Sequence, residues 1–263
     1  MFAPSKVLFL LCGLLLTQSL PAAQRVLVGA TEYRPYVAMP AQGQPSGLLP
    51  ELLQAMNEVQ DDYRFEITLT STGRRYRDFT SGRLDLMLFE SRQWGWQDIP
   101  MQTLELGIDD SEVFVARAAP GRDQNYFATL EGKRLGLHVG YHYAFADFES
   151  DSERLHQRFD AIISRSHEAN LEMLLHQRID LTVMAKSYLR MYFDEHPELR
   201  ERLLVSTRVD QTFRPLALIR PDGPIDAERL ASILEILQRN GRYAALLTRY
   251  HLDPVPASGK PKR

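Results

Sequence analysis

The stretch that decides the fold runs from Ser81 to Arg92 and reads SGRLDLMLFESR, and a similar stretch, HQRIDLTVMAKS, runs from His176 to Ser187. In both, Arg-x-Asp precedes a short apolar run that is too short for a helix, which is typical of a buried strand in a parallel sheet. Two such units predict two similar α/β lobes. Polar residues follow the first apolar run, at the carboxyl end of the strand, where open α/β sheets bind ligands.

Composition and charge narrow the class of protein. The chain has 263 residues, of which 44% are hydrophobic and 25% charged, as in a globular protein of one or two compact domains. A net charge of −3 and a pI of about 6.2 predict no basic surface for nucleic acid or anionic lipid.

The first residues have the pattern of an export signal. Lys6 precedes an apolar core over residues 7–16, and small residues follow up to residue 23, so residues 1–23 are predicted to be a cleaved signal peptide. The apolar core is shorter than the roughly 20 residues that span a bilayer. Cys12 is the single cysteine and lies in this core after Leu11, which disfavours lipidation and predicts a mature chain without disulfide, reactive thiol or cysteine metal ligand.

The mature chain alternates short strands with amphipathic helices. Expected strands cover residues 24–30, 63–70, 84–89, 111–117, 161–164 and 180–184, with others inside 130–140 and 212–220. Expected helices cover residues 49–59 and 76–81, a helix after the cap Ser166, and two closing helices around 230–237 and 243–250. Asp85 and Asp180 share the entry position of the repeated strands, which predicts a structural role for both.

Taken in this order, VLVGATEYRPY, GLLPELLQAMNE, SGRLDLM, LEGKRLGLHVG and NGRYAALLTRY resemble the bacterial periplasmic solute-binding proteins of the polar amino acid type (extracellular solute-binding protein family 3). The resemblance implies a type II periplasmic binding protein fold, with two α/β lobes, a central cleft and two crossing segments. It implies lobe one over residues 24–112 and 220–263 and lobe two over 113–219. It also implies a periplasmic monomer without cofactor or metal, which delivers a small polar solute to the permease of an ABC importer.

The resemblance also suggests which residues of the first lobe contact the solute. Aromatic side chains of the loop after the first strand, and polar groups after the third strand, occupy the matching positions. An arginine of this region is expected to hold a ligand carboxylate as a bidentate fork. The residues at these positions are Tyr33, Tyr36, Phe89, Glu90, Ser91 and Arg92, with Arg74 and its neighbour Arg75 as alternative arginines.

The second lobe departs from the family pattern. Tyr141 and His142 stand where relatives have threonine or serine, and Ala185 stands where relatives have an ammonium-binding aspartate. Lys186 follows, and its charge would repel an ammonium by about 1 kcal/mol or more. Either another acid replaces the aspartate, the candidates being Glu32, Glu90 and Glu168, or the ligand carries no amine. The cleft is therefore expected between residues 31–36, 72–75, 89–96, 140–143 and 185–186.

Other functions remain alternatives. No Gly-x-Ser-x-Gly, phosphate loop or His-Glu-x-x-His is present, so the common hydrolase, nucleotide and metalloprotease motifs are missing. The scaffold is also similar to that of periplasmic cyclohexadienyl dehydratases, in which Glu90 or Glu168 would be the acid. A third alternative is a ligand-sensing module read by a membrane receptor. Trp94 and Trp96 fit either ligand contact or packing within the first lobe.

Overall fold

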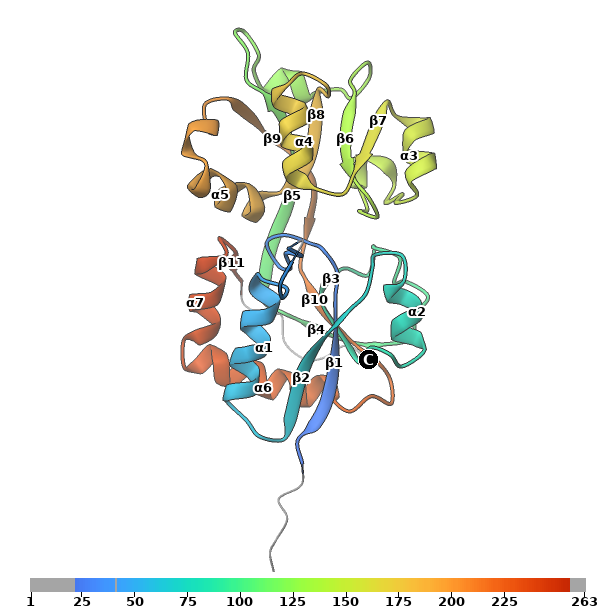
Figure 1. Cartoon of the computed structure of the whole chain (residues 1–263), viewed down its shortest axis with the longest axis vertical. Helices are drawn as coiled ribbons and strands as arrows, with labels where there is room; N and C mark the ends of the chain where they lie inside the picture. The colour runs from blue at the N-terminus through green and yellow to red at the C-terminus, as the bar shows by residue number, and fades with distance from the viewer. Residues whose placement is uncertain (1–21, 41, 256–263) are drawn as a thin grey trace, which may run out of the picture.

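The structure is a computed structural model that describes residues 22–40 and 42–255. It consists of two α/β lobes stacked along the long axis (Figure 1). The predicted two-lobed α/β fold is therefore confirmed. Nearly all of the predicted signal peptide, residues 1–21, lies outside the described residues.

The first lobe is built on a sheet with the strand order β2-β1-β3-β10-β4. Strands β1 and β2 are parallel, as are β1 and β3, whereas β10 runs antiparallel to β3 and β4. The elements are β1 (Gln24–Ala30), α1 (Leu48–Glu58), β2 (Tyr63–Leu69), α2 (Arg75–Thr80), β3 (Leu86–Glu90), β4 (Gln102–Glu105), β10 (Leu216–Ile219), α6 (Ala227–Arg239) and α7 (Arg242–Arg249).

The second lobe contains the strands β5, β8, β6 and β7 in that order, and β9 pairs with β5. Strands β6, β7 and β8 are parallel, and β5 runs antiparallel to β8 and β9. The elements are β5 (Ile108–Arg117), β6 (Leu135–His138), α3 (Ser152–Arg158), β7 (Ala161–Ser164), α4 (His167–Leu175), β8 (Leu181–Ala185), α5 (Lys186–Glu195) and β9 (Leu203–Phe213). Short 3-10 turns cover Gln124–Phe127, Ala144–Ala146 and Pro197–Leu199, and β11 (Asp253–Pro254) pairs with the start of β5.

Each lobe contains the same βαβαβ unit, and the two repeated sequence stretches contain its third strand, β3 in one lobe and β8 in the other. Asp85 accepts a hydrogen bond from the backbone N–H of Leu27 at 2.9 Å, and Asp180 accepts one from Arg134 N–H at 2.9 Å. Each carboxylate thus ties the entry of the third strand to the first strand of its own unit. The predicted structural role of both aspartates is confirmed.

Helix α1 shows how the sequence pattern produces the packing. Its apolar residues recur every three or four positions, so Leu48, Leu49, Leu52, Leu53, Ala55 and Met56 are all buried against the first sheet and the closing helices. Each fully buried leucine contributes roughly 1.5 to 3 kcal/mol, and this face therefore anchors the first lobe.

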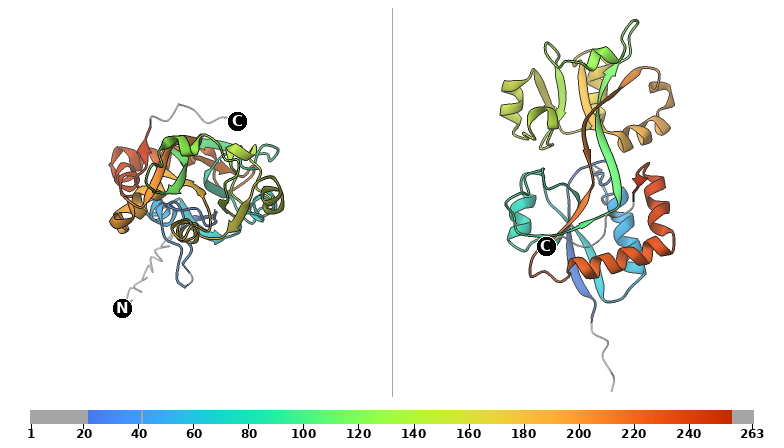
Figure 2. Two further views of the ribbon diagram at one scale, coloured as in Figure 1. Left: turned by 90° about the horizontal axis from the view of Figure 1, so that it is seen from above. Right: turned by 180° about the vertical axis from the view of Figure 1, so that it is seen from behind.

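Two long strands connect the lobes. Strands β5 and β9 pair antiparallel from Asp110–Phe213 to Arg117–Leu203, and Figure 2 shows them running side by side from one lobe to the other. Strand β10, which follows β9 directly, lies between β3 and β4 of the first sheet. From the sequence, lobe two is expected to end at residue 219 and the chain to return there to lobe one. The lobe boundaries stay a prediction.

Candidate functional site

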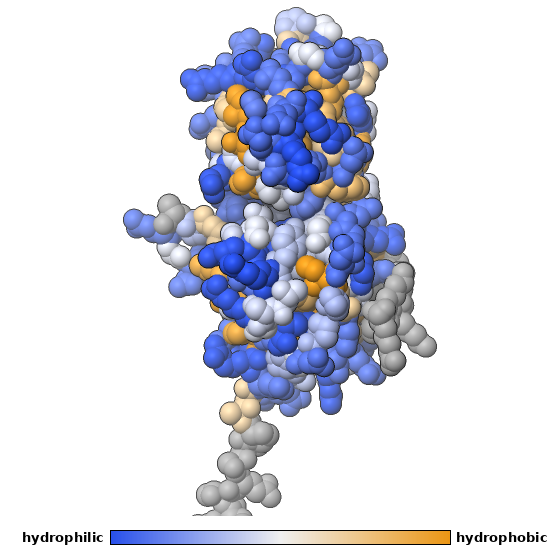
Figure 3. Space-filling view, turned by 90° about the vertical axis from the view of Figure 1, so that its right-hand side faces the viewer, coloured by the Kyte–Doolittle hydropathy of each residue, from blue (hydrophilic) through white to orange (hydrophobic). Residues whose placement is uncertain are grey.

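A cavity of about 540 Å³, its opening included, lies where the lobes meet. It is bordered by the carboxyl ends of β1, β3 and β6, and by β5, which connects the lobes. Figure 3 shows the waist between the two halves, which is mostly hydrophilic on this side. The lining consists of Gly29, Thr31, Glu32, Tyr33, Tyr36, Val37, Thr72, Arg75, Met87, Leu88, Phe89, Glu90, Trp94, Glu112, Gly140, Tyr141 and His142.

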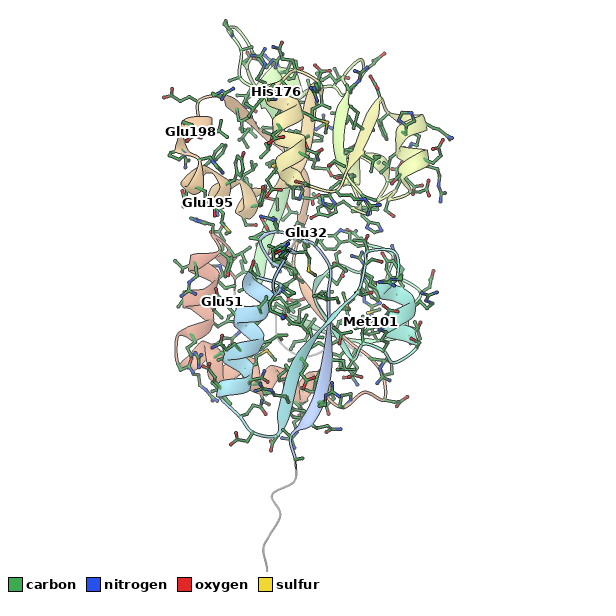
Figure 4. The ribbon with its side chains drawn as sticks, viewed as in Figure 1. Glu32, Glu51, Met101, His176, Glu195 and Glu198 are labelled. Carbon is green, nitrogen blue, oxygen red and sulfur yellow. The ribbon has the colours of Figure 1, made fainter. Side chains whose placement is uncertain are left out.

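The structure brings most of the predicted site residues together at this cavity. Those that line it are Glu32, Tyr33, Tyr36, Arg75, Phe89, Glu90, Tyr141 and His142. Arg74, Arg92 and Lys186 are exposed and Ser91 is half-buried, and none of these four is in the lining. Glu32 lies at the boundary between the lobes, whereas His176 lies at the far end of the second lobe (Figure 4). Ligand contact by each of the predicted residues stays a prediction.

Aromatic rings form the walls of the cavity. Tyr33 is stacked on Tyr36 with 5.0 Å between ring centroids, and it meets Trp94 and Tyr141 edge-on at 5.5 Å each. The hydroxyl of Tyr33 is buried and has no hydrogen-bond partner among the described residues. Leaving a buried polar group unpaired costs about 1 to 3 kcal/mol, so this hydroxyl is a group that a bound polar solute can satisfy. Trp96, by contrast, is fully buried between Tyr76 and Phe79 and packs within the first lobe.

The backbone at the end of β3 has an unusual conformation at the cavity. Phe89 has a φ of 64°, a left-handed region that bulky residues rarely adopt. A register shift between β3 and β10 occurs at the same place. Phe89 is buried, with its ring 4.7 Å from that of Tyr36, and this packing holds it in the lining.

Arg75 and Glu90 form a buried ion pair in the wall of the cavity. Arg75 Nη1 lies 3.4 Å from Glu90 Oε1, and Glu90 Oε2 accepts a hydrogen bond of 2.9 Å from the Trp96 indole. Burial raises the pKa of Glu90, and the charge of Arg75 and the indole N–H oppose that rise. Arg75 Nη2 donates to the Tyr76 hydroxyl at 2.9 Å, whereas Nε is buried without an acceptor. One guanidinium N–H therefore has no acceptor among the described residues.

Glu112 lines the cavity from β5, and no prediction from the sequence identified it. Its Oε2 accepts a hydrogen bond of 2.7 Å from Gln211 Nε2 on β9. The pKa of Glu112 is raised to about 8, because burial, together with repulsion by Asp210 and Asp110, outweighs the opposing hydrogen bond from Gln211. Glu112 is thus mostly protonated at neutral pH. The signal in the sequence was an acid inside the apolar strand SEVFVAR.

His142 is a neutral group of the cavity at physiological pH. Burial and, to a smaller extent, the nearby positive charge of Arg75 lower the pKa of His142 to about 4. The backbone carbonyl of His142 accepts a hydrogen bond of 2.7 Å from Gln211 Nε2. The same side-chain amide therefore joins this loop to Glu112.

The lobes contact each other around the cavity. Arg34 Nη1, from the loop after β1, lies 3.0 Å from Oε1 of Glu168 at the start of α4. The same arginine pairs with Glu32 at 3.0 Å. Gly140 comes so close to Thr72 that a Cβ built on Gly140 would lie 2.6 Å from the threonine hydroxyl. These contacts describe a closed arrangement of the two lobes.

Asp110 links the first lobe to α5 at the hinge. Its Oδ2 accepts hydrogen bonds from the Tyr36 hydroxyl at 3.1 Å and from the Ser187 hydroxyl at 2.6 Å. Burial raises the pKa of Asp110, and these hydrogen bonds oppose the rise. Tyr36, a residue of the cavity wall, is thereby fixed to the strand about which the lobes would move.

Within the described ranges, no helix combines the length and the apolar character needed to cross a membrane.

Across residues 22–40 and 42–255, no group of three or more His, Cys, Asp and Glu side chains is arranged to hold a metal ion.

Comparison with known proteins gives structural likeness without close sequence likeness. No protein-family model and no curated protein matches the sequence. A mutant of ArgBP from T. maritima is 16% identical with a TM-score of 0.64, covering 86% of this chain and 95% of that one. The putative binding component of an ABC transporter from Wolinella succinogenes, complexed with lysine, is 14% identical with a TM-score of 0.65, covering 86% and 94%.

A histidine kinase sensor domain with similarity to periplasmic binding proteins is 21% identical with a TM-score of 0.60, covering 87% of this chain and 96% of that one. These likenesses span nearly the whole of each solved chain, and both lobes therefore have counterparts there. The chain has the two-lobed fold of the substrate-binding proteins of amino acid ABC transporters.

Proposed function

We propose that this protein captures a small polar solute, an amino acid or a related carboxylate or amine, between its two lobes. The observation that carries the proposal is a cavity lined from both lobes, with a buried guanidinium N–H and a buried phenol hydroxyl left without partners. Unpaired buried polar groups are costly, and a polar ligand would satisfy them. Arg75 Nε would donate to a ligand oxygen, and the rings of Tyr33, Trp94 and Tyr141 would pack against its body.

Binding and closure are coupled in this proposal. Tyr33 and Arg75 belong to the first lobe, and Tyr141 and His142 belong to the second, so a ligand contacts all of them only when the lobes are closed. A ligand that binds the closed state better than the open state shifts the population toward closure. The crossing pair of β5 and β9 would act as the hinge.

The predicted export signal and the fold favour a protein that works in the periplasm and delivers its solute to the permease of an ABC importer. One neighbour, 13% identical with a TM-score of 0.62, is the substrate-binding protein of an amino acid ABC transporter. We propose a monomer without cofactor for this role. The dehydratase alternative is weaker because its two candidate acids are each paired with an arginine, Glu90 with Arg75 and Glu168 with Arg34.

A sensor role is the second candidate, favoured by the likeness to a histidine kinase sensor domain. The same closure would then be read by a membrane receptor instead of a permease. Affinity capture of membrane proteins with the ligand-bound chain would distinguish the two, because the retained partner would be either a permease or a receptor.

A thermal-shift screen over amino acids, carboxylates, amines and short peptides tests the binding function. A ligand present at 100 times its dissociation constant stabilises the folded state by about 2.7 kcal/mol, which gives a clear rise in the melting temperature. A hit is then confirmed by calorimetry and by small-angle scattering, which reports closure. A screen in which no compound of any class raises the melting temperature would contradict the proposal.

A further inference from the structure

Glu112 lies on β5, a strand that connects the lobes, and it lines the cavity together with residues of both lobes. It lies on β5 directly opposite Ala185 of β8 in the antiparallel register, so the two side chains share one face of the sheet. Ala185 contributes only a methyl group there and is buried. The carboxylate of Glu112 therefore faces the cavity with no acid or base from the opposite strand beside it.

The position of this carboxylate is fixed by a neighbour from the other crossing strand. Gln211 Nε2 donates to Glu112 Oε2 at 2.7 Å and to the carbonyl of His142 at 2.7 Å, while Gln211 Oε1 accepts from the Trp94 indole at 3.2 Å. Three groups thus define the orientation of one amide, and the amide in turn orients Glu112. A carboxylate held this way is preorganised for a partner in the cavity.

Glu112 lacks the basic partner that the other acids of the cavity have. Glu32 is paired with Arg34 and Glu90 with Arg75. Among the residues that the structure describes, no lysine, arginine or histidine nitrogen lies within 4.0 Å of the Glu112 carboxylate. A buried carboxylate stays ionised only when paired, so a positively charged partner that ionises Glu112 would come from outside the described residues.

We propose that Glu112 binds the positively charged group of the solute, a protonated amine or a guanidinium. This inference rests on the proposed function and assigns a subsite within the same cavity. The cation would enter between the Glu112 carboxylate and the aromatic walls, where Tyr33 and Trp94 supply π faces that attract positive charge. Glu112, on the connecting strand β5, would thus recognise the amine of the solute.

Cation binding would be coupled to proton release. The empty cavity holds Glu112 protonated at neutral pH because its pKa is raised to about 8 by burial and by nearby negative charge. The ionisable groups facing it are Asp110 of β5, Asp210 of β9, and the tyrosines Tyr33, Tyr36, Tyr141 and Tyr143. None of these groups is a cation, so an incoming cation would add to the Gln211 hydrogen bond in favouring the ionised carboxylate.

The test compares the wild-type chain with Glu112→Gln, which keeps the shape and removes the charge. Probes are the common L-amino acids, agmatine and putrescine, together with the 2-hydroxy acid analogues of the amino acids that bind. We expect Glu112→Gln to weaken amine-bearing probes about 10- to 150-fold and to leave hydroxy acids unchanged. Calorimetry of the wild type in two buffers of different ionisation enthalpy should show about one proton released at pH 7 per amine bound.

Glu235→Gln, the same substitution at an exposed residue of α6, is the matched control and should leave all affinities unchanged. Equal binding of amine-bearing probes by the wild type and Glu112→Gln would overturn the inference. Binding of carboxylates without any binding of amines would also overturn it and would leave the proposed function intact. No binding by any probe, or by any compound of the wider screen, would instead contradict the proposed function itself.

Discussion

Arg34 of the first lobe and Glu168 of the second form an ion pair, with 3.0 Å between Nη1 and Oε1. Each side of the pair is held in place by its own lobe. Arg34 Nε also contacts Glu32 at 3.0 Å, and Glu168 accepts hydrogen bonds from Ser166 at 2.7 Å and Tyr188 at 3.0 Å. Because the two residues belong to different lobes, this contact depends on closure of the lobes.

Replacing Arg34 by alanine should therefore weaken closure, and within the first lobe it removes only the partly exposed pair with Glu32. The side chains of Arg34 and Glu168 are 34% and 40% exposed, and a pair this accessible contributes only about 0.2 to 1 kcal/mol. We expect the affinity for an identified ligand to fall by about 1.5- to 5-fold and the radius of gyration of the free protein to increase. The control is Arg25→Ala, because the Arg25–Glu66 pair joins β1 to β2 within one lobe; equal losses in both variants would contradict this role.

Gly140 should be required for the closest approach of the lobes. An alanine there would place its methyl 2.6 Å from Thr72 Oγ1 and 2.8 Å from Thr72 Cβ, and we expect Gly140→Ala to lower ligand affinity about 5- to 100-fold. Gly121 has a similar φ of +74° but open space around it. Gly121→Ala therefore has the same backbone penalty without the clash. Calorimetry should show that this variant binds the ligand with unchanged affinity.

The buried carboxylate of Glu112 should make the stability of the empty protein depend on pH. Its pKa is raised from 4.5 to about 8 in the folded state, so the folded state binds more protons than the unfolded state between these values. Stability from this group is fully present below pH 4.5 and is lost as pH rises through 8. From pH 5 to pH 8 the wild type should lose up to about 4 kcal/mol relative to Glu112→Gln, measured by urea unfolding without ligand. Parallel pH profiles for the two proteins would show that the carboxylate is not buried in this way.

The pair of Arg75 and Glu90 should be essential for the first lobe. Removing Arg75 leaves a buried, uncompensated carboxylate, so Arg75→Ala should lower the free energy of unfolding by about 3 to 5 kcal/mol. The exposed neighbour Arg74 provides the control, and Arg74→Ala should change it by less than about 0.5 kcal/mol. A double variant with Arg75→Met and Glu90→Gln should recover part of the loss, because neither charge remains. Equal denaturation midpoints for the two single variants would disprove the buried pair.

The sequence predicted the fold from local patterns that the structure preserves. The repeated Arg-x-Asp stretches become β3 and β8, and the period of apolar residues in 49–59 becomes the buried face of α1. These features depend on residues close together in the chain. Ser166 likewise caps α4, accepting a hydrogen bond from Ala169 N–H at 3.2 Å, as its position before the helix predicts.

The remaining features depend on contacts between distant segments. Glu112 was missed because its environment is made by Gln211, 99 positions away, and by the register with β8. The choice between Arg74 and Arg75 depended on the residue at which α2 begins. The helix begins at Arg75, whose side chain is buried, whereas Arg74 directly before it is exposed. Helices α3 and α5, strand β4 and most of β9 were not predicted from the sequence, and β3 and β5 were predicted with different ends.

The insertion of β10 between β3 and β4 determines the order in which the lobes can be completed. The segment 108–213 supplies every strand of the second sheet except the short β11, whereas the first sheet lacks an internal strand until residue 219 has been added. Until β10 is in place, the edges of β3 and β4 that it joins have no partner, whereas the second sheet can already be complete. A fragment ending before Leu216 would therefore expose those strand edges to aggregation.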